Sequence, residues 1–430
     1  MISGRNSIFK LVASLIIFTG GAASIFSQEY DFDIPEEEYK IEFNGNLDAK
    51  WGLLRSNSDS PIYGLQFFDD PEKQDYLSQY RLDFYLNGEY RHKEVGFTLK
   101  TYYQYVKEDP LPPSIFELYG SLNISPKMTV GIGKRRFNWG KAYAFNPVGY
   151  VNAAKDPENP DLALAGKPSA FLNFNKSFSD KALQNLSFSA VALAPDAEFA
   201  DKFAAADDIN FAAKFYLLYR NIDIDFMTYQ AKNQPTRYGF DFAANLLPNL
   251  EIHAEMSYAQ HESRFVRQNE NTVAIEKNGS SFVLGLRYLN QSNTTLIAEY
   301  YHNNNGFSQE EFSAVINYLD LNLQTSEPDR IAAARSSLPV LFPARTVMRD
   351  YFYAKLSKPE PLGWLYSSVS LFTIYNLTDD SFLLSPQIGY KPFTNSEFLL
   401  WPTFFFGDEN SEYGAKQFQN KIELWLRFYF

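Results

Sequence analysis

Charged and aromatic side chains are dense in residues 136–168 and just before them. Four bases come first and three acids follow, with aromatic residues between them: Lys134, Arg135, Arg136, Trp139, Lys141, Tyr143, Asp156, Glu158 and Asp161. Opposed charges held across a narrow aqueous passage orient dipolar or ionic solutes. We therefore expect these nine residues to form a constriction in a loop that folds inward. The alternative is a flap that packs on the rim.

Eight further charged residues are expected to line the same passage. They occupy the polar positions of segments in which polar and apolar residues alternate: Arg81, Asp83, Lys100, Arg237, Asp241, Glu255, Arg287 and Glu299. Acids and bases are interspersed among them. Pairing between neighbouring strands is therefore the alternative to contact with a solute.

The sequence offers little for catalysis or metal binding. None of its four histidines belongs to an H-E-x-x-H motif or has another metal-ligand spacing. It has no cysteine, which excludes a disulfide framework, a lipoprotein anchor and covalent haem attachment. We predict no enzyme activity, no cofactor and no metal site, although sequence distance alone neither assembles nor refutes a Ser/His group.

Strands must position these side chains, because several long segments have a period of two. In residues 41–53, Ile41 and Trp51 share the apolar parity, and Asp48 and Lys50 share the polar one. The same alternation recurs in residues 80–91, 238–246, 250–258 and 422–430. Each such strand would have one apolar and one polar face.

Strand length and aromatic content favour a membrane barrel over a soluble sandwich or barrel, which is the alternative. Many strands span about ten residues, as a tilted membrane strand does, whereas soluble strands average ~5–6. Aromatic residues make up 17% of the chain, as expected for interfacial girdles. Tight turns alternate with longer connections such as 54–75, 136–168, 260–279 and 303–349. We predict an all-β, transmembrane, antiparallel up-and-down barrel of about 18 strands, or 16, over residues 39–430.

The first 38 residues read as two short segments ahead of the barrel. Residues 1–27 combine basic Arg5 and Lys10, an apolar run and small residues, which is typical of a signal peptide. Residues 28–38 are acidic and would form a solvated tail or bind a cation.

Residues 303–349 break the β pattern and predict a helical external loop. Ser308 is a suitable helix cap with Glu311 three residues later, and Phe312, Val315 and Leu319 follow at helical spacing. Residues 328–338 could form a second helix. Such a loop would be a lid, a partner-binding surface or a rim cover.

Two stretches resemble known Gram-negative proteins. Residues 133–161, GKRRFNWGKAYAFNPVGYVNAAKDPENPD, resemble outer-membrane porin-like barrels, among them alginate-export-type and related uncharacterised porins. The resemblance rests on Gly133, Arg135, Trp139, Gly140, Asn146, Pro147 and Asn152, with a second similarity in residues 298–312. Ile422 to Phe430 looks like the terminal strand that barrel-insertion machinery recognises. The resemblance implies an outer-membrane channel fold.

Together these features predict an exported, porin-like outer-membrane channel for passive diffusion of small hydrophilic solutes, constricted by residues 136–168. Its partners would be outer-membrane lipid, the insertion machinery and the solutes. A net charge of −12 argues against nucleic acid. The alternatives are a surface-exposed structural or adhesin-type barrel, supported by residues 303–349, and, less favoured, an outer-membrane enzyme.

Overall fold

The structure is a computed structural model of the 430-residue chain. It describes residues 40–69, 74–106, 111–162, 165–179, 181–194, 209–232, 234–268, 271–325 and 327–430. Contacts divide the chain into Met1–Glu38 and Tyr39–Phe430. The expected signal peptide (1–27) and acidic segment (28–38) lie outside the described residues, so both stay predictions.

Strands dominate the described part of the chain. Their bounds are β1 (Lys40–Ser56), β2 (Tyr76–His92), β3 (Val95–Val106), β4 (Ser114–Ser125), β5 (Met128–Arg135), β6 (Lys167–Ser177), β7 (Leu183–Leu193), β8 (Asn210–Tyr219), β9 (Ile222–Gln230), β10 (Thr236–Leu247), β11 (Leu250–Gln268), β12 (Asn271–Leu289), β13 (Thr295–His302), β14 (Asp350–Pro359), β15 (Ser367–Asn376), β16 (Phe382–Phe393), β17 (Ser396–Phe406) and β18 (Phe418–Tyr429).

These strands form one closed sheet. Within the described residues, 18 strands are joined antiparallel to their neighbours in chain order. β1 closes the sheet, because Trp51 lies opposite Tyr80 of β2 on one side and Leu424 of β18 on the other. The predicted all-β antiparallel barrel of 18 strands is confirmed, and the fallback of 16 is not needed.

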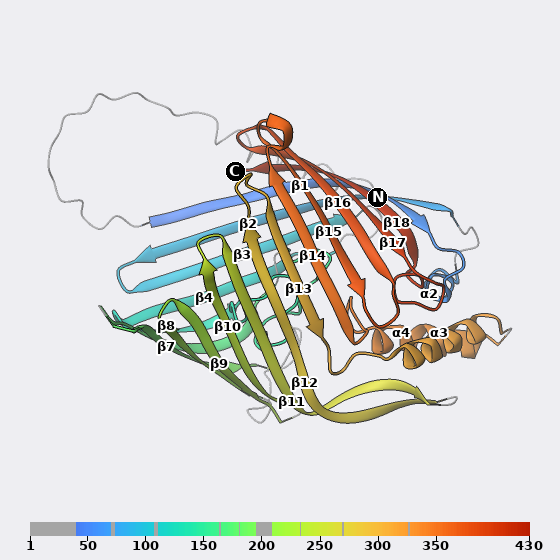
Figure 1. Ribbon diagram of the computed structural model, residues 1–430, viewed down its shortest axis with the longest axis horizontal. Helices are drawn as coiled ribbons and strands as arrows, with labels where there is room; N and C mark the ends of the chain where they lie inside the picture. The colour runs from blue at the N-terminus through green and yellow to red at the C-terminus, as the bar shows by residue number, and fades with distance from the viewer. Residues whose placement is uncertain are drawn as a thin grey trace, which may run out of the picture. The chain divides into compact units, whose positions relative to one another are not determined.

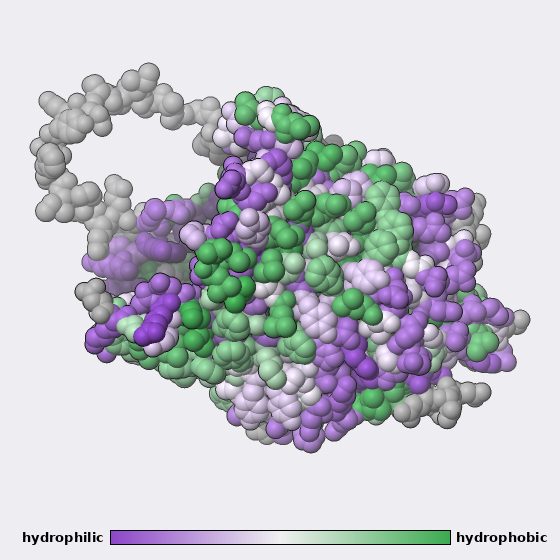
Figure 2. Space-filling model, in the orientation of Figure 1, coloured by the Kyte–Doolittle hydropathy of each residue, from purple (hydrophilic) through white to green (hydrophobic). Residues whose placement is uncertain are grey.

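Many strands separate apolar from charged side chains, as the period of two predicted for residues 41–53. On β1, Ile41 and Phe43 are exposed, whereas Asp48 and Lys50 on the other parity are buried. Figure 2 shows apolar surface gathered over the middle of the strands and polar surface towards both ends. The outer face is therefore mainly apolar, and most of the charged strand residues lie on the inner face.

Short turns and long connections lie at opposite ends of the strands (Figure 1). The connection 260–279, expected to be a long loop, is instead a strand hairpin, because β11 continues to Gln268 and β12 starts at Asn271. Its polar residues alternate with apolar ones such as Val266, which is buried. The hairpin thus gains an apolar core beyond the barrel wall, which the sequence reading missed.

The long connections carry the helices: α2 (Pro61–Gln66), α3 (Gln309–Leu323) and α4 (Pro328–Leu341). α3 begins where the sequence predicted: the Ser308 side chain accepts from the Glu311 backbone N–H, and the Glu311 carboxylate accepts from the Ser308 N–H. Phe312 and Leu319 are buried on its inner face. Among the described residues, no helix is long and apolar enough to cross a membrane.

Candidate functional site

The connection between β5 and β6, residues 136–166, packs against the inner faces of two groups of strands. On one side, Phe137 and Trp139 belong to a buried apolar cluster with Phe171 of β6, Val191 of β7 and Met227 of β9. Bulky side chains in this connection are buried because the strand walls cover them. This packing explains why a long loop carries so many aromatic residues.

On the other side, Phe145 anchors the same connection. Its ring stacks on Tyr301 of β13 with centroids 4.5 Å apart and also lies near Tyr351 and Tyr353 of β14. Phe145, Tyr351 and Tyr353 are all buried. The connection is therefore held by aromatic contacts to strands on both sides.

Between these two anchors lies a row of buried carboxylates on the inner face. Asp241 of β10 is directly opposite Asp225 of β9 and Glu255 of β11, and Glu299 stands on β13. We call Asp225, Asp241, Glu255 and Glu299 the acid row. Their exposed fractions are 0, 0, 1 and 1%. Buried acids at such a density need partners, because an unpaired buried charge is costly.

Backbone N–H groups of the connection supply those partners. The amides of Lys141 and Ala142 donate to Glu255 Oε1 at 2.5 and 2.6 Å. The amides of Tyr143 and Ala144 donate to the two oxygens of Glu299, the second at 2.9 Å. Two carboxylates thus hold four consecutive peptide N–H groups. Charge-assisted bonds of this kind are the stronger ones in proteins.

Two lysines complete the attachment. Lys141 Nζ lies 3.0 Å from the Asp225 carboxylate. Burial alone would lower the pKa of Lys141, but Asp225, with Asp241 and Asp223, outweighs burial and holds this pKa above its usual range. Lys155 Nζ donates to the carbonyl oxygens of Ala142 and Tyr143 at 2.5 and 3.1 Å, and burial lowers the pKa of Lys155. The strand carboxylates and Lys155 therefore hold the N–H and C=O groups of the same short stretch.

The Tyr143 side chain leads to a third contact. Its hydroxyl donates to Asp161 at 2.8 Å and lies 2.6 Å from Lys355 Nζ on β14. Lys355 Nζ is also 3.6 Å from Asp161. Burial and the neighbouring Asp161 raise the pKa of Tyr143, so its hydroxyl stays protonated and can donate.

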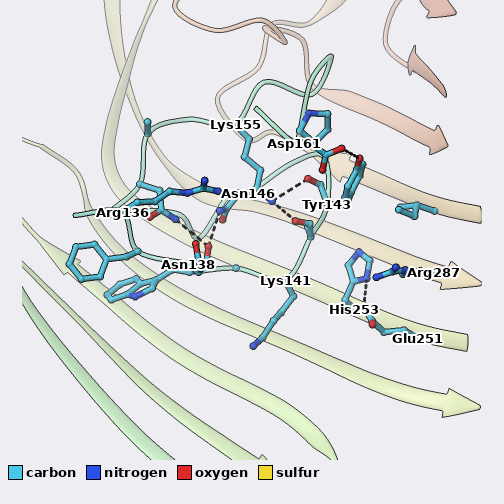
Figure 3. Close-up of a pocket in the computed structure, with 18 residues that line it drawn as sticks. Arg136, Asn138, Lys141, Tyr143, Asn146, Lys155, Asp161, Glu251, His253 and Arg287 are labelled. Carbon is cyan, nitrogen blue, oxygen red and sulfur yellow. Dashed lines mark hydrogen bonds and ion pairs between the residues drawn. The ribbon is translucent and has the colours of Figure 1, made fainter. Parts of the chain in front are cut away.

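A cavity of about 330 Å³ lies beside this attachment (Figure 3). The connection and strands β11 to β13 line it with both signs of charge, and the labelled side chains are Arg136, Asn138, Lys141, Tyr143, Asn146, Lys155, Asp161, Glu251, His253 and Arg287. No carboxylate is seen to pair with the side chains of Arg136 or Arg287 in the described residues. Polar groups of both signs around a hollow suit a polar or charged solute.

Trp139, one of the nine predicted constriction residues, also lines this cavity, with Arg136, Lys141, Tyr143 and Asp161. Lys134 lies elsewhere: it is in register with Leu118 and Pro168 and shares its face with exposed Ile132, so it points to the outer face. The reason is the strand itself, since β5 runs to Arg135 and alternation turns Lys134 away.

Three more predicted constriction residues lie outside the cavity lining. Arg135 packs its guanidinium 4.1 Å from the Phe171 ring. Asp156 lies 3.7 Å from Arg345, and Glu158 lies 4.0 Å from Lys421 of β18. The expected opposition between bases at the start and acids at the end holds for Asp161 alone. The chain between 146 and 161 carries the other two acids to a different wall.

These two acids differ in their electrostatics. Burial and the nearby Glu158 raise the pKa of Asp156. Burial alone would also raise the pKa of Glu158, but Lys416, Lys421 and Arg345 outweigh it and lower that pKa. Glu158 is therefore an ionised anchor.

Among the predicted lining residues outside the acid row, most bases pair with acids on the inner face. Arg81 Nε lies 3.1 Å from Asp83, which Lys50 Nζ also contacts at 2.6 Å. Lys100 pairs with Glu117 at 2.7 Å and Arg237 with Glu262 at 2.9 Å. Cross-strand pairing thus accounts for these bases, whereas Arg287 faces the cavity.

Sequence reasoning missed several residues of this site. Lys155, Asn138 and His253 were not predicted as site residues, and Asn146 was named only for the resemblance, yet all four line the cavity. His253 Nε2 lies 3.0 Å from Glu299 Oε1, and its parity on β11 was the available signal. Lys155 carried no signal of its own, because its partners are backbone carbonyls.

Comparisons with known proteins bear on the fold. No family model matches the sequence, and no curated protein matches it either. Solved structures do match. OccK3 (OpdO) of Pseudomonas aeruginosa has a TM-score of 0.54 and 10% identity over 90% of this chain and 96% of its own. A BenF-like porin of Pseudomonas fluorescens Pf-5 has a TM-score of 0.53 and 9% identity, covering 90% and 98%.

A third match is OccK2 (OpdF) of P. aeruginosa, solved in complex with glucuronate, with a TM-score of 0.51, 11% identity and coverage of 90% and 98%. At such identities the likeness concerns the fold. The chain therefore has the fold of outer-membrane porins. The comparisons do not bear on the alginate-export-type part of the predicted resemblance, which stays a prediction.

Proposed function

We propose that this protein is a channel of a Gram-negative outer membrane through which small hydrophilic solutes diffuse passively. Residues 136–168 form its constriction, and transport needs no cofactor or catalytic group. The apolar outer face fits hydrocarbon, and the charged inner face fits an aqueous bore. The likeness to porins over nine-tenths of the chain supports the same class of function.

The observation that carries this proposal is the attachment of the connection to the inner wall. Glu255 and Glu299 bind the backbone of residues 141–144, so this part of the connection cannot swing away from the wall without leaving buried carboxylates unpaired. A constriction fixed in this way narrows the bore permanently. The cavity beside it, with Arg136, Lys155 and Arg287 against Asp161 and Glu251, is the point at which passing solutes are selected.

Charge at this cavity suggests which solutes to test. One fold neighbour was crystallised with glucuronate, a sugar acid. Guanidinium groups bind carboxylates well, and Arg136 and Arg287 both line the cavity. We expect sugar acids to pass at least as readily as neutral sugars of the same size.

Liposome swelling and planar-bilayer conductance test the proposal together. The purified protein should make vesicles permeable to glucose and glucuronate and should give steady single-channel steps. Deleting residues 142–161, which removes the Phe145 anchor and the backbone bound by Glu299, should enlarge the step. A protein that reconstitutes but gives neither swelling nor conductance contradicts the proposal.

The membrane partners belong to the same proposal. Export through residues 1–27, contact with outer-membrane lipid and recognition of Ile422 to Phe430 by the insertion machinery would place the barrel. An adhesin-type role remains the alternative function, and binding that maps to residues 303–349 without solute passage would favour it. The porin-like fold favours a channel function over an enzyme activity.

A further inference from the structure

The turn between β14 and β15 is a run of large apolar residues at the end of the barrel that carries the short turns. It contains the short helix η2 (Pro361–Gly363). Leu362 is fully exposed, and its neighbours Trp364, Leu365 and Tyr366 are exposed as well. By contrast, the turn between β12 and β13 reads NQSNT, residues 290–294. We call residues 361–366 the apolar turn. Large apolar side chains fully in water are unfavourable, so such a cluster marks a contact surface.

The backbone holds these side chains outward in a defined conformation. Glu360, Leu362 and Tyr366 have φ of 47°, 55° and 61°, a region that costs non-glycine residues roughly 1 kcal/mol each. Hydrogen bonds fix the turn: the Trp364 N–H donates to Pro361 O at 3.0 Å, and the Ser367 hydroxyl donates to Trp364 O at 2.6 Å. The exposure is therefore built into the turn.

The apolar turn continues the outer face of the barrel. The ring of Trp364 lies 5.2 Å from that of Tyr390 on β16. Tyr390 pairs in register with Phe398 of β17 and lies on the same face of β16 as Ile388. Phe398 and Ile388 are both exposed on the outside of the barrel. In Figure 1 the turn (orange) projects beyond the strand ends, away from the helices. Its contact surface is thus continuous with the apolar wall.

One lysine, Lys358, flanks the turn on the outer face at the level of the strand ends. Lys358 is on the outer parity of β14, opposite Val369, and its Nζ donates to Ser292 O. Lys391 is on the opposite, inner parity of β16: its Nζ lies 3.9 Å from the Glu397 carboxylate, and its backbone N–H donates to Tyr366 O. Lysines beside aromatic residues are typical of the level of lipid phosphates, where their stems reach along apolar surface.

We propose that residues 361–366 insert into the interfacial region of the phospholipid leaflet on the short-turn side and anchor the barrel there. The occupant of this surface is lipid, because the turn is continuous with the apolar wall and Lys358 flanks it on the outer face. Trp364 and Tyr366 suit that interface, since each combines an apolar ring with a polar group. The inference rests on the membrane location in the proposed function.

The chain contains no cysteine, so single cysteines can carry an environment-sensitive nitrobenzoxadiazole label. Leu362→Cys tests the apolar turn, and Leu365→Cys repeats the test at a second position. Gln291→Cys, in the polar turn between β12 and β13, is the matched control in water. Leu371→Cys, exposed on the outer face of β15, is the control in hydrocarbon. Each labelled protein is reconstituted into vesicles of phosphatidylethanolamine and phosphatidylglycerol.

Iodide quenching separates the outcomes. Labels at 362 and 365 should be quenched roughly threefold less than the label at 291, at every protein-to-lipid ratio. Quenching at 362 and 365 equal to that at 291, with 371 protected, overturns the anchor and leaves the membrane location intact. Quenching at 371 as well overturns the location itself. Protection only at high protein density indicates a second copy of the chain and also overturns the lipid contact.

Discussion

Two long connections at the same end of the barrel are held in different ways. Residues 136–166 are bound through their backbone by Glu255 and Glu299. Residues 303–349 are bound through the apolar faces of their helices, with Phe312 and Leu319 in a buried cluster. The first attachment is directional and fixes a few peptide groups. The second is mainly non-directional and grows with the apolar area buried, although Glu412 accepts from the Val347 N–H and Arg264 pairs with Glu311.

This difference suggests that the two connections have different roles. A bore needs a constriction placed within fractions of an ångström, and charged hydrogen bonds supply such placement. A cover for the rim needs only to stay packed. Changes to residues 136–166 should therefore alter conductance, whereas changes to residues 303–349 should alter the local stability of that connection. Four substitutions or conditions test this difference.

The double substitution Glu255→Gln with Glu299→Gln should have the largest effect. At Glu299, which accepts through both oxygens, the amide turns a donor towards one of the two N–H groups. At Glu255, whose Oε1 accepts from both N–H groups, the amide oxygen keeps the bonds but loses the charge that strengthens them. We expect a loss of about 3 kcal/mol or more in stability, and single-channel conductance should rise about twofold or more.

The matched control is Glu276→Gln on β12, whose side chain is largely exposed. It makes the same chemical change away from the connection and should leave conductance unchanged. If the double variant conducts like the wild type, the attachment does not set the bore.

Phe312→Ala should loosen the helical connection by about 3 kcal/mol, because it leaves a cavity beside Phe307 and Phe342. Limited proteolysis should then cut residues 303–349 faster, with a smaller change in conductance than the double variant gives. Leu321→Ala, at an exposed position of the same helix, is the control. The protease should cut residues 303–349 of this variant at the wild-type rate. Equal changes in conductance for Phe312→Ala and the double variant would remove the proposed distinction.

Rising pH should weaken the rim where Glu412 contacts residues 303–349. Burial raises the pKa of Glu412 to about 7, although its carboxylate accepts from the Val347 N–H and the Tyr351 hydroxyl. The folded state thus holds a proton that the unfolded chain loses near 4.5. Its stabilising contribution is full below that pH and is lost as pH rises towards 7.

Proteolysis of residues 303–349 at pH 5 and pH 8 measures this effect, with the protease supplied at equal activity. The wild type should be cut faster at pH 8, and the difference should shrink in Glu412→Gln, which cannot ionise. Equal pH dependence in both proteins would show that another group titrates.

Ser308→Ala should have the smallest effect, about 1 kcal/mol. It removes the hydroxyl that accepts from the Glu311 N–H at 3.3 Å, so the first turn of α3 should fray. Faster hydrogen exchange at residues 309–312 is the measurement, and Ser336→Ala, at an exposed position near the middle of α4, is the control. Unchanged exchange would mean that packing alone holds the start of the helix.

Local patterns predicted much of this molecule. Alternation over 41–53 and 422–430 placed β1 and β18, and the spacing of Ser308 and Glu311 placed the start of α3. The pattern failed at 260–279, where polar residues suggested a loop but the strands continue. There, contacts with the helices supply the apolar partner that the sequence does not display.

The sequence by itself determined which side chains share a face, because a strand turns successive residues to opposite sides whatever lies around it. It therefore determined the closed sheet with an apolar exterior and a charged interior. Only the tertiary structure decided which charges meet. Glu255 and Glu299 bind the backbone of residues 141–144, more than a hundred positions away, and Lys134 points outward while Asp156 and Glu158 reach another wall. These pairings depend on the path of one long connection. Backbone N–H groups occur whatever the residue type, so the sequence does not show which of them a carboxylate binds.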